Sequence, residues 1–278
     1  MPHSDSAPPM DRYAVIGNPI AHSLSPAIHA RFAAQLGERI EYTALLAPLD
    51  GFAQTARTFF AAGGRGANVT LPFKVEAFEL ADAASERARR AGAANFLAQR
   101  DGRVVADNTD GAGLVADLQR NLGLRLRGAR ILVLGAGGAT RGVLGPLLAE
   151  APAALVIANR GVERARSLVQ RFAALGPVEA CALDAIPRRD FDLVLNATSA
   201  STKGEALVLP DTLWRAHPFA YDMAYGPAAR AFVAQAHGCR ACDGLGMLVE
   251  QAAESWLLWR GTRPATAEVI AALRSGTS

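Results

Sequence analysis

A glycine-rich turn between an apolar strand and a helix constrains the fold of this chain most. The run Ile131–Leu134 is short, continuous and apolar, as in a parallel strand that is buried on both faces. Three glycines within residues 135–138 follow it and lead into a predicted helix over Ala139–Glu150. Such a turn leaves backbone N–H groups and the positive helix end free for a dinucleotide pyrophosphate. A turn that binds no ligand is the alternative, because Thr140 replaces the usual third glycine.

The end of the next predicted strand bears on the choice of nucleotide. Ala154–Ala158 is followed by Asn159 and Arg160, and Arg164 lies one turn into the following helix. An NAD site normally has an acidic residue at this strand end for the ribose 2′-hydroxyl. A guanidinium suits a 2′-phosphate because it is always charged and forks onto phosphate oxygens. The pattern favours NADP over NAD, and the alternative is that both arginines are ordinary surface residues.

Lysine is rare in this sequence, which draws attention to one position. Only Lys74 and Lys203 are lysines among the 29 Lys and Arg residues. Lys74 follows the predicted strand Ala67–Thr70 and starts a helix, at an edge where open α/β sheets bind ligands. A desolvated amine can give up a proton near neutral pH, whereas a guanidinium cannot. Asp110, which opens a predicted helix over Ala112–Leu122, could pair with this amine in proton transfer. The alternatives are a surface lysine and a helix-capping aspartate.

The first predicted strand, Arg12–Ile16, leads into a loop that contains two serines. Ser25 precedes Pro26, and a hydroxyl followed by proline predicts that Ser25 caps a helix that runs to about Leu36. Ser23 and Ser25 also lie where the hydroxyls or carboxylate of a ligand could meet them. The alternative is that Ser25 only caps the helix and Ser23 only turns the chain.

The remaining apolar runs alternate with helical segments, which is the pattern of an α/β protein. Further strands are predicted at Glu41–Leu46, Ala93–Ala98, Val104–Ala106, Phe191–Asn196, Phe219–Met223 and Arg240–Cys242, and further helices at Phe52–Ala62, Leu248–Arg260 and Thr266–Leu273. Asp101 and Gly102 predict a hairpin turn. The strands at 191–196 and 219–223 lead into polar segments that we expect to lie over the nucleotide.

Composition limits the classes of protein to consider. The chain has 278 residues and is half hydrophobic, enough for the core of one large or two ordinary domains. The net charge of +3 gives no indication of nucleic-acid binding, and no apolar run is long enough to span a membrane. The three cysteines, Cys181, Cys239 and Cys242, fit a reducing cytoplasm. We interpret the Cys-x-x-Cys spacing as small buried residues in a strand and predict no metal site. Met1–Met10 is polar and is predicted to be a disordered lead-in.

Several short segments together carry a family resemblance. In chain order they are Gly17–Pro26, Asn68–Lys74, Gly92–Asn95, Asn108–Gly111, Gly135–Ala139, Asn159–Arg160, Asn196–Ser199, Asp222–Tyr225 and Asp243–Gln251. Each is weak alone, but all of them in this order are highly specific and extend over nearly the whole chain. On these segments the sequence closely resembles the shikimate dehydrogenase family.

The resemblance implies NADPH-dependent reduction of 3-dehydroshikimate to shikimate, and the reverse reaction, in the shikimate pathway of aromatic amino acid biosynthesis. It implies that Lys74 and Asp110 form the catalytic pair. The substrate contacts that it implies are Ser23, Ser25, Asn68, Thr70, Asn95, Asp110, Tyr225 and Gln251. The cofactor contacts expected for NADP are Gly135, Ala136, Gly137, Gly138, Ala139, Asn159, Arg160, Arg164, Thr198, Met223, Gly244 and Met247.

The family fold consists of an N-terminal α/β substrate domain and a doubly wound, Rossmann-type NADP domain, with C-terminal helices that return to the first domain. The expected division is residues 1–110 with 246–278 for the substrate and 111–245 for NADP. Glycines near residues 110–113 and 244–246, where the chain crosses between the domains, are predicted hinges. We expect a cytoplasmic monomer or homodimer that acts on a small molecule, without a nucleic-acid or membrane partner.

Two positions depart from the family pattern. Phe96 stands where Thr is common, and Arg230 stands where Thr is frequent, so packing near the substrate could differ.

Three alternatives stay open on the sequence alone. The nearest is a quinate/shikimate dehydrogenase that uses NAD, against which the Asn159–Arg160 strand end argues. A non-catalytic NADP-binding sensor would make the Lys74–Asp110 pair a coincidence. An unrelated dehydrogenase on a similar two-domain plan would not account for the serine loop together with Gln251.

Overall fold

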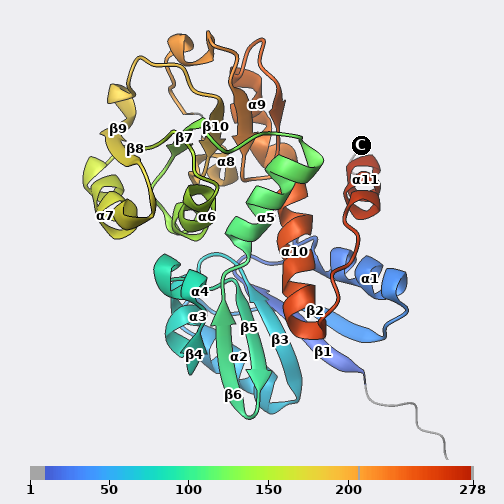
Figure 1. Ribbon diagram of the computed structural model, residues 1–278. Coiled ribbons are helices and arrows are strands. Elements are labelled where there is room, and N and C mark those ends of the chain that lie inside the picture. The colour runs from blue at the N-terminus through green and yellow to red at the C-terminus, as the bar shows by residue number, and fades with distance from the viewer. Residues whose placement is uncertain (1–9, 206, 277–278) are drawn as a thin grey trace, which may run out of the picture.

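Two six-stranded sheets with helices packed on them make up the fold. The computed structural model describes residues 10–205 and 207–276, and the lead-in predicted at the N-terminus lies, except for Met10, outside these residues. Figure 1 shows the two sheets one above the other, with α5 (Asp110–Ala116) and α10 (Leu245–Arg260) running between them. The predicted α/β class with two sheet regions is confirmed.

The first sheet is mixed and has the strand order β2-β1-β3-β5-β6-β4. Its strands are β1 (Asp11–Gly17), β2 (Ile40–Leu46), β3 (Gly64–Val69), β4 (Ala83–Ala84), β5 (Phe96–Arg100) and β6 (Arg103–Asp107). The helices between them are α1 (Ser25–Leu36), α2 (Phe52–Ala61), α3 (Lys74–Leu80) and α4 (Glu86–Ala91). β1 pairs in parallel with β2 and β3, whereas β5 runs antiparallel to β3 and β6. Because β1 and β3 are parallel, the serine loop and Thr70 follow them at the same edge of the sheet.

Apolar side chains on both faces of the first sheet determine which helices cover it. On one face, Ile16 and Val69 pack in a cluster with aromatic residues of α2 and of the turn before α3. On the other face, the Trp259 ring of α10 lies 4.7 Å from that of Tyr13 and 5.1 Å from that of Phe96, between centroids. Phe96, one of the two departures from the family pattern, therefore supports α10 through ring packing.

The second sheet is wholly parallel, and its order is β12-β11-β10-β7-β8-β9. Its strands are β7 (Arg130–Leu134), β8 (Ala154–Asn159), β9 (Val178–Ala182), β10 (Leu193–Asn196), β11 (Phe219–Asp222) and β12 (Ala241–Cys242). The helices are α6 (Gly138–Ala149), α7 (Val162–Phe172), α8 (Ala200–Lys203) and α9 (Arg230–Gln235), with single 3₁₀ turns at Ala173–Leu175, Leu183–Ala185, Asp211–Trp214 and Gly226–Ala229. Counted within the sheet, this is the order 3-2-1-4-5-6 of a dinucleotide-binding fold. The predicted doubly wound sheet is confirmed.

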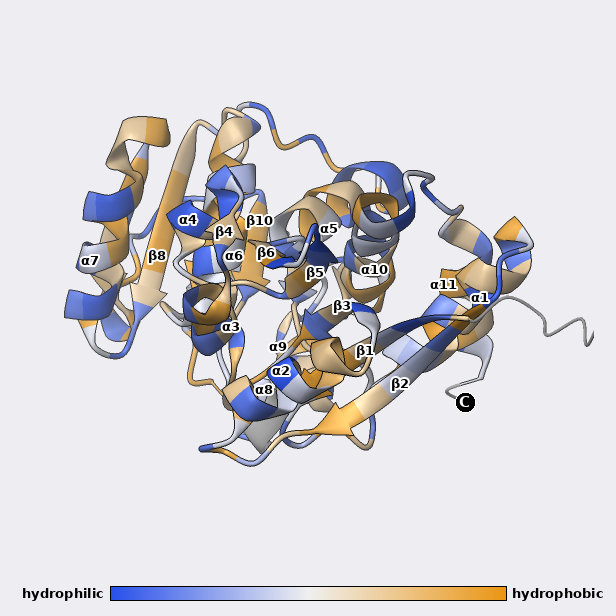
Figure 2. Cartoon of the chain, turned by 90° about the horizontal axis from the view of Figure 1, so that it is seen from below, coloured by the Kyte–Doolittle hydropathy of each residue, from blue (hydrophilic) through white to orange (hydrophobic). Residues whose placement is uncertain are grey.

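Alternate residues of the second sheet point to opposite faces, and both faces are covered. Ile131 and Val133 of β7 belong to one apolar cluster, whereas Leu132 and Leu134 belong to another. A strand that is buried on both sides needs apolar residues at every position, which is what the continuous run in β7 provides. Figure 2 shows that β8 is likewise coloured as apolar, whereas α7 beside it also carries hydrophilic segments.

The C-terminal helices pack on the first half of the chain, as predicted. Trp256 and Val249 of α10 share an apolar cluster with Ile28 and Phe32 of α1, and α11 (Ala267–Ser275) contributes Val269. In the part of the chain that the structure describes, no helix combines the length and the apolar character needed to cross a membrane.

Several helix starts differ from the prediction. α1 begins at Ser25 itself and Leu24 holds the capping position, so the predicted Ser25 cap is wrong. The Ser23 hydroxyl instead accepts a hydrogen bond from the Ser25 N–H at 3.3 Å, which satisfies one of the free N–H groups at the helix start. α5 begins two residues earlier than predicted, at Asp110, and continues as a π-helical turn over Asp117–Asn121.

Strand and helix limits elsewhere also required correction. The hairpin at Asp101 and Gly102 is confirmed, since both residues have positive φ angles of 49° and 75°. The strand before it starts at Phe96 and not at Ala93, and α10 starts three residues before the predicted position. The elements β4, α4, β9, α8 and α9 were not predicted because they are too short to show a clear hydrophobic period. Cys242 lies in β12, as interpreted, whereas Cys239 precedes this strand, and both thiols are free and only partly buried.

Two glycines allow α5 and α10 to lie in close contact. A Cβ at Gly113 would lie 2.6 Å from the backbone nitrogen of Gln251, and a Cβ at Gly246 would overlap the Asp117 carboxylate. These positions therefore require glycine because of the close approach of two helices, a reason different from the predicted hinges.

Two glycine-to-alanine variants test the close contact, one at the contact between the helices and one at a control position. Gly113→Ala is expected to lower the free energy of unfolding by about 1–3 kcal/mol, because the new Cβ overlaps backbone. Gly145→Ala in α6 is the control, since its Cβ would lie 3.7 Å from Phe172 in ordinary contact. That variant should be neutral or more stable by up to about 1 kcal/mol. Urea unfolding curves measure both, and equal stabilities would contradict the packing argument.

Candidate active site

Two charged side chains from different elements meet at the edge of the first sheet. Lys74 is the first residue of α3, and Asp110 is the first residue of α5. Lys74 Nζ lies 2.6 Å from Asp110 Oδ2, and the two side chains are 18% and 8% exposed. At this distance and with this little water, the pair forms a strong charge-assisted hydrogen bond. The arrangement places an ammonium group and a carboxylate side by side.

The Asn95 amide contacts the other oxygen of this carboxylate. Asn95 Nδ2 lies 2.8 Å from Asp110 Oδ1, 2.9 Å from Thr109 Oγ1 and 3.2 Å from Gln251 Oε1. Asn95 Oδ1 in turn accepts the Thr109 N–H at 2.7 Å. Both oxygens of Asp110 thus have a donor, one from Lys74 and one from Asn95. These contacts fix the orientation of the carboxylate.

A further layer of side chains supports this cluster from below. Asn68 Nδ2 donates to Ser255 Oγ at 2.9 Å, and Ser255 Oγ lies 3.2 Å from Thr109 Oγ1. The Tyr42 hydroxyl donates to Asn68 Oδ1 at 2.8 Å. The His29 ring stacks on Tyr42 with 4.1 Å between centroids. Burial lowers the pKa of His29 to about 3 and raises the pKa of Tyr42 well above its ordinary value, so both rings are neutral near pH 7.

Other predicted substrate residues lie at the start of α1. Tyr225 packs against Leu24, and burial raises the pKa of its hydroxyl, although a hydrogen bond with the Leu24 backbone opposes this. Ser25 is buried and hydrogen-bonds with the Tyr42 hydroxyl. Thr70, directly after β3, is partly exposed. Ser23 is also partly exposed, on the loop between β1 and α1.

The structure thus connects some of the predicted residues and leaves others apart. Lys74, Asp110, Asn95, Asn68 and Gln251 share one hydrogen-bonded cluster, to which Ser25 is linked through Tyr42. Within the described residues, Ser23, Thr70 and Tyr225 are not part of this cluster. Ser23 and Thr70 come from the loops after β1 and β3 of the first sheet, whereas Tyr225 follows β11 of the second sheet.

The glycine-rich turn has open space in front of two exposed glycines. A Cβ on Gly137 or Gly138 would meet no described atom within 4 Å. Gly135 has a left-handed φ of 101°, and a Cβ there would approach the Thr198 side chain to 3.0 Å. The Thr140 hydroxyl donates to the Gly135 carbonyl at 2.8 Å, so the residue in the third glycine position stabilises the turn. The N-terminus of the twelve-residue helix α6 is accessible to a phosphate group.

The neighbouring strand end carries the two arginines. Asn159 Oδ1 accepts the Ala136 N–H at 3.2 Å, so this amide joins the strand end to the glycine-rich turn. Arg160 and Arg164 are exposed, and Arg160 Nη2 lies 3.6 Å from Glu205 Oε2. An exposed pair at that distance contributes little to stability, so the guanidinium is free to bind a stronger anion.

The last four predicted cofactor residues follow β10, β11 and β12. Thr198 Oγ1 donates to Asn196 Oδ1 at 2.8 Å. Gly244 allows the close approach of the Met223 carbonyl, which a Cβ would overlap. Met247 is buried in the apolar cluster of the second sheet, against which Met223 packs. Among residues 10–205 and 207–276, no three His, Cys, Asp or Glu side chains gather as a metal-binding group.

Thr109, Ser255 and Tyr42 belong to the cluster but were not predicted as site residues. Ser255 lies four residues after Gln251 on α10 and therefore on the same helix face, a signal that the sequence did contain. Thr109 adjoins Asp110, but its neighbourhood offered no reason to separate it from a helix cap. Tyr42 lies on β2 in an apolar run and carried no signal of its own.

Comparison with known proteins shows the family. Three family models match in order: shikimate dehydrogenase substrate binding domain over residues 15–97, shikimate / quinate 5-dehydrogenase over 117–206, and shikimate 5′-dehydrogenase C-terminal domain over 244–274. The shikimate dehydrogenase (NADP(+)) of Aromatoleum aromaticum is 55% identical to this chain, over 95% of this chain and 97% of that protein. The chain belongs to the shikimate dehydrogenase family.

Solved structures extend the likeness of this shikimate dehydrogenase family member to three dimensions. An Ael1 enzyme from Pseudomonas putida has a TM-score of 0.89 and 46% identity, with 95% of this chain and 98% of that chain covered. The shikimate 5-dehydrogenase from Thermus thermophilus, solved in complex with NADP(H) and shikimate, has a TM-score of 0.80 and 32% identity. That comparison covers 96% of this chain and 99% of the other. The family likeness therefore extends over both sheets.

Replacing Lys74 tests whether its amine transfers a proton in this family member. Lys74→Ala is expected to lower turnover by about two to four orders of magnitude, the scale of a lost proton-transfer group. Lys74→Arg keeps the charge but cannot release a proton, so it should be similarly impaired. Arg65→Ala, an exposed residue in β3, is the control and should leave turnover unchanged. Initial rates of nucleotide reduction give the comparison, and a Lys74→Ala enzyme with most of its turnover would refute the role.

Proposed function

We propose that this chain catalyses the NADP-dependent, reversible reduction of 3-dehydroshikimate to shikimate, in the pathway that leads to chorismate and the aromatic amino acids. The observation that carries the proposal is the Lys74–Asp110 pair, 2.6 Å apart beside a buried cluster of amides and hydroxyls. The relative from Aromatoleum aromaticum, 55% identical, is named for this substrate and this nucleotide. The composition of the cluster agrees with a small, polar substrate.

The proposed substrate contacts are neutral hydrogen-bonding groups around one charged pair. A small polyhydroxylated acid needs a partner for each hydroxyl that it buries, and amides and hydroxyls supply both donors and acceptors. The proposed contacts are Ser23, Ser25, Asn68, Thr70, Asn95, Asp110, Tyr225 and Gln251. They come from the loop after β1 and the start of α1, from β3 and the residue after it, from the turn before β5, and from α5, α10 and the segment after β11.

The proposed catalytic roles follow from the charges of the pair. NADPH, when bound, supplies a hydride to the carbonyl carbon of the substrate. The carbonyl oxygen then gains negative charge, and the Lys74 ammonium stabilises this charge and donates the proton that completes the alcohol. Asp110 holds the amine in place and accepts a hydrogen bond from a substrate hydroxyl. In the oxidation direction the same amine receives the hydroxyl proton.

The proposed cofactor contacts surround the turn between β7 and α6. The open space at Gly137 and Gly138 fits a group whose phosphates approach the backbone closely. The exposed Arg160 and Arg164, together with an amide in place of a carboxylate at Asn159, fit a 2′-phosphate. The proposal also includes Gly135, Ala136, Ala139, Thr198, Met223, Gly244 and Met247.

The organisation of the molecule is proposed on the same basis. Residues 1–110 with 246–278 form the substrate domain, and residues 111–245 form the NADP domain. The two separate sheets support this division. We further propose a cytoplasmic monomer or homodimer that binds no nucleic acid, in agreement with the low net charge of +3.

Initial rates with two substrates and two nucleotides test the proposed function. Shikimate with NADP is expected to react much faster than shikimate with NAD or quinate with NADP. NADP is expected to be preferred because the strand end carries Asn159 and Arg160 instead of a carboxylate. Shikimate is expected to be preferred because the similar proteins are named for that substrate. Comparable rates with quinate or NAD would favour the quinate/shikimate alternative. Absence of activity with every combination, with NADP still bound, would favour a sensor.

Removing a single guanidinium tests the proposed 2′-phosphate site. Arg160→Ala is expected to raise KM for NADP by roughly tenfold or more, the effect of losing a hydrogen bond to a charged group, and to leave KM for NAD unchanged. Arg166→Ala, on the helix α7 that follows Arg160 and paired with Glu163, is the matched control. If both variants bind NADP like the original protein, Arg160 does not contact the 2′-phosphate.

A further inference from the structure

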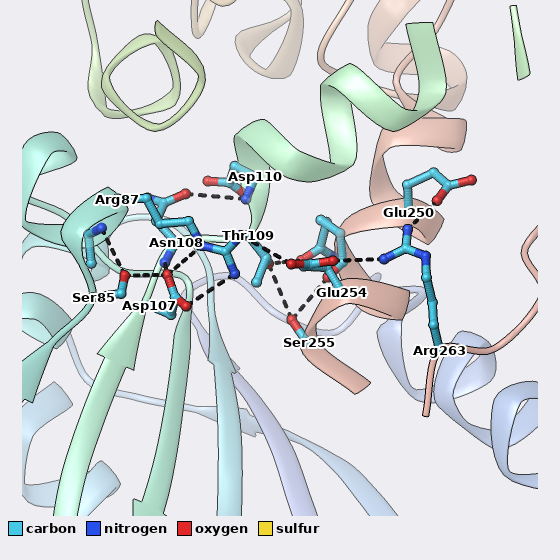
Figure 3. Close-up of polar contacts among 12 residues, drawn as sticks. Ser85, Arg87, Asp107, Asn108, Thr109, Asp110, Glu250, Glu254, Ser255 and Arg263 are labelled. Atoms are coloured by element: carbon cyan, nitrogen blue, oxygen red, sulfur yellow. Dashed lines mark hydrogen bonds and ion pairs between the residues drawn. The ribbon is translucent and has the colours of Figure 1, made fainter. Parts of the chain in front are cut away.

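We propose that Arg87, which is outside the reacting groups, is a positioning residue for the Asp110 carboxylate. The proposal rests on the function proposed above. Figure 3 shows the Arg87 side chain beside Asp107 and extended toward Glu254, with Asp110 three residues beyond Asp107 along the chain. Asp110 is a site residue predicted from the sequence, whereas Arg87, Asp107 and Glu254 were not predicted.

Arg87 binds the carboxylate at the end of β6 through both sides of its fork. Arg87 Nε lies 2.6 Å from Asp107 Oδ1, and Nη2 lies 3.1 Å from Oδ2. The exposed fractions of the two side chains are 28% and 13%. Ser85, the cap of α4, also donates its hydroxyl to Asp107 Oδ1. Two donors from α4 and the residue before it therefore fix the plane of this carboxylate.

Hydrogen bonds of Asn108 connect the Asp107 carboxylate to the backbone of Asp110. Asp107 Oδ1 accepts the Asn108 N–H at 2.6 Å, and Asn108 Oδ1 accepts the Asp110 N–H at 3.2 Å. Asn108 Nδ2 donates to the Ala93 carbonyl at 3.1 Å, in the turn that also carries Asn95. The chain of hydrogen bonds thus runs from Arg87 to the backbone of Asp110, the first residue of α5.

The third nitrogen of the same guanidinium connects this segment to α10. Arg87 Nη1 lies 3.1 Å from Glu254 Oε1. Arg263, in the loop after α10, binds Glu254 Oε2 at 2.8 Å and Glu250 Oε2 at 2.7 Å. Gln251, one turn from Glu254, contacts Asn95 in the cluster around Asp110. Arg87 consequently contacts both the end of β6 and α10, and it fixes the position of these two elements relative to each other.

Packing against neighbouring side chains does not by itself hold Arg87 in place. Arg87 lines two neighbouring hollows of about 420 and 390 Å³, between α4, α6 and Pro146 on one side and along α5 and α10 on the other. Water would fill the space left by a truncated side chain, and no apolar neighbour would restore the contacts. A lysine could supply charge here but not the planar fork that binds two oxygens of Asp107 and one of Glu254.

Kinetics of three variants give the first test. Arg87→Met is expected to lower kcat for shikimate oxidation roughly ten- to hundredfold, because a displacement of about 1 Å in a reacting group has effects of this size. KM for NADP should stay within about twofold, since the nucleotide contacts are not touched. Arg87→Lys, which keeps the charge and guards against a Met variant that fails to fold, should be impaired to an intermediate degree. Arg90→Met, an exposed residue of α4 paired with Glu86, is the matched control and should behave like the original protein.

The reactivity of Lys74 gives a second test that does not require activity. The Lys74 amine is in contact with Asp110 at 2.6 Å and its side chain is 18% exposed, so acetic anhydride reaches it slowly. Arg87→Met loosens Asp110 and should raise the acetylation of Lys74 several-fold relative to Lys203, the only other lysine, as measured by mass spectrometry of proteolytic fragments. Arg90→Met should leave this ratio unchanged.

The outcomes separate positioning from stability and from the proposed function. A slower Arg87→Met enzyme with a raised Lys74 ratio supports the proposal. Unchanged kcat, or a slower enzyme whose Lys74 ratio is unchanged and whose loss follows only its lower Tm, overturns it. If the unsubstituted protein does not oxidise shikimate, the proposed function is wrong, and the Lys74 ratio alone still decides whether Arg87 positions Asp110.

Discussion

The hydrogen bonds of the segment from Asp107 to Asp110 are the constraint on which the arrangement of the site depends. This segment ends the first sheet and starts α5, so it is a covalent link between the two halves of the molecule. It is nearly buried, and a buried backbone must find partners for its polar groups. The partners are Asn95, the Asn108 side chain and the Asp107 carboxylate. The same contacts that satisfy the backbone also orient the carboxylate beside Lys74.

The support below this segment is aromatic and neutral. Tyr42 fixes Asn68 by a hydrogen bond, and the His29 ring lies flat against Tyr42. Because burial keeps both rings uncharged, the only formal charges within the cluster are those of Lys74 and Asp110. A cluster of this kind does not compete electrostatically with the pair. In the proposed function, a bound substrate would therefore meet one amine and one carboxylate among neutral groups.

Much of this architecture could be predicted because its signals are local. The apolar run of β7 and the glycines after it are adjacent in sequence, and they correctly predicted the doubly wound sheet. The resemblance segments likewise pointed to residues that the structure brings together, such as Asn95 and Gln251. Local reasoning failed where two signals competed, as at Ser25. There the side chain turns toward Tyr42 and Ser23 satisfies the helix start.

The rest could not be predicted because it depends on contacts between distant residues. Arg87 is one of many arginines, and nothing in its neighbourhood indicates that Glu254 will reach it from α10. α4, which carries Arg87, is only six residues long and has no clear period. The role of the glycines between the sheets was also hidden, because a sequence cannot distinguish a glycine needed for bending from one needed for close approach.

That close approach determines how the molecule can move. With Gly113 against Gln251 and Gly246 against Asp117, α5 and α10 pack closely together as one strut, and Figure 1 shows both helices running between the sheets. A rotation of one sheet relative to the other must then occur at the ends of the strut. Asp110 stands at one of those ends, whereas Lys74 belongs to the first sheet's own α3. A change in the angle between the sheets would therefore also change the position of Asp110 relative to Lys74.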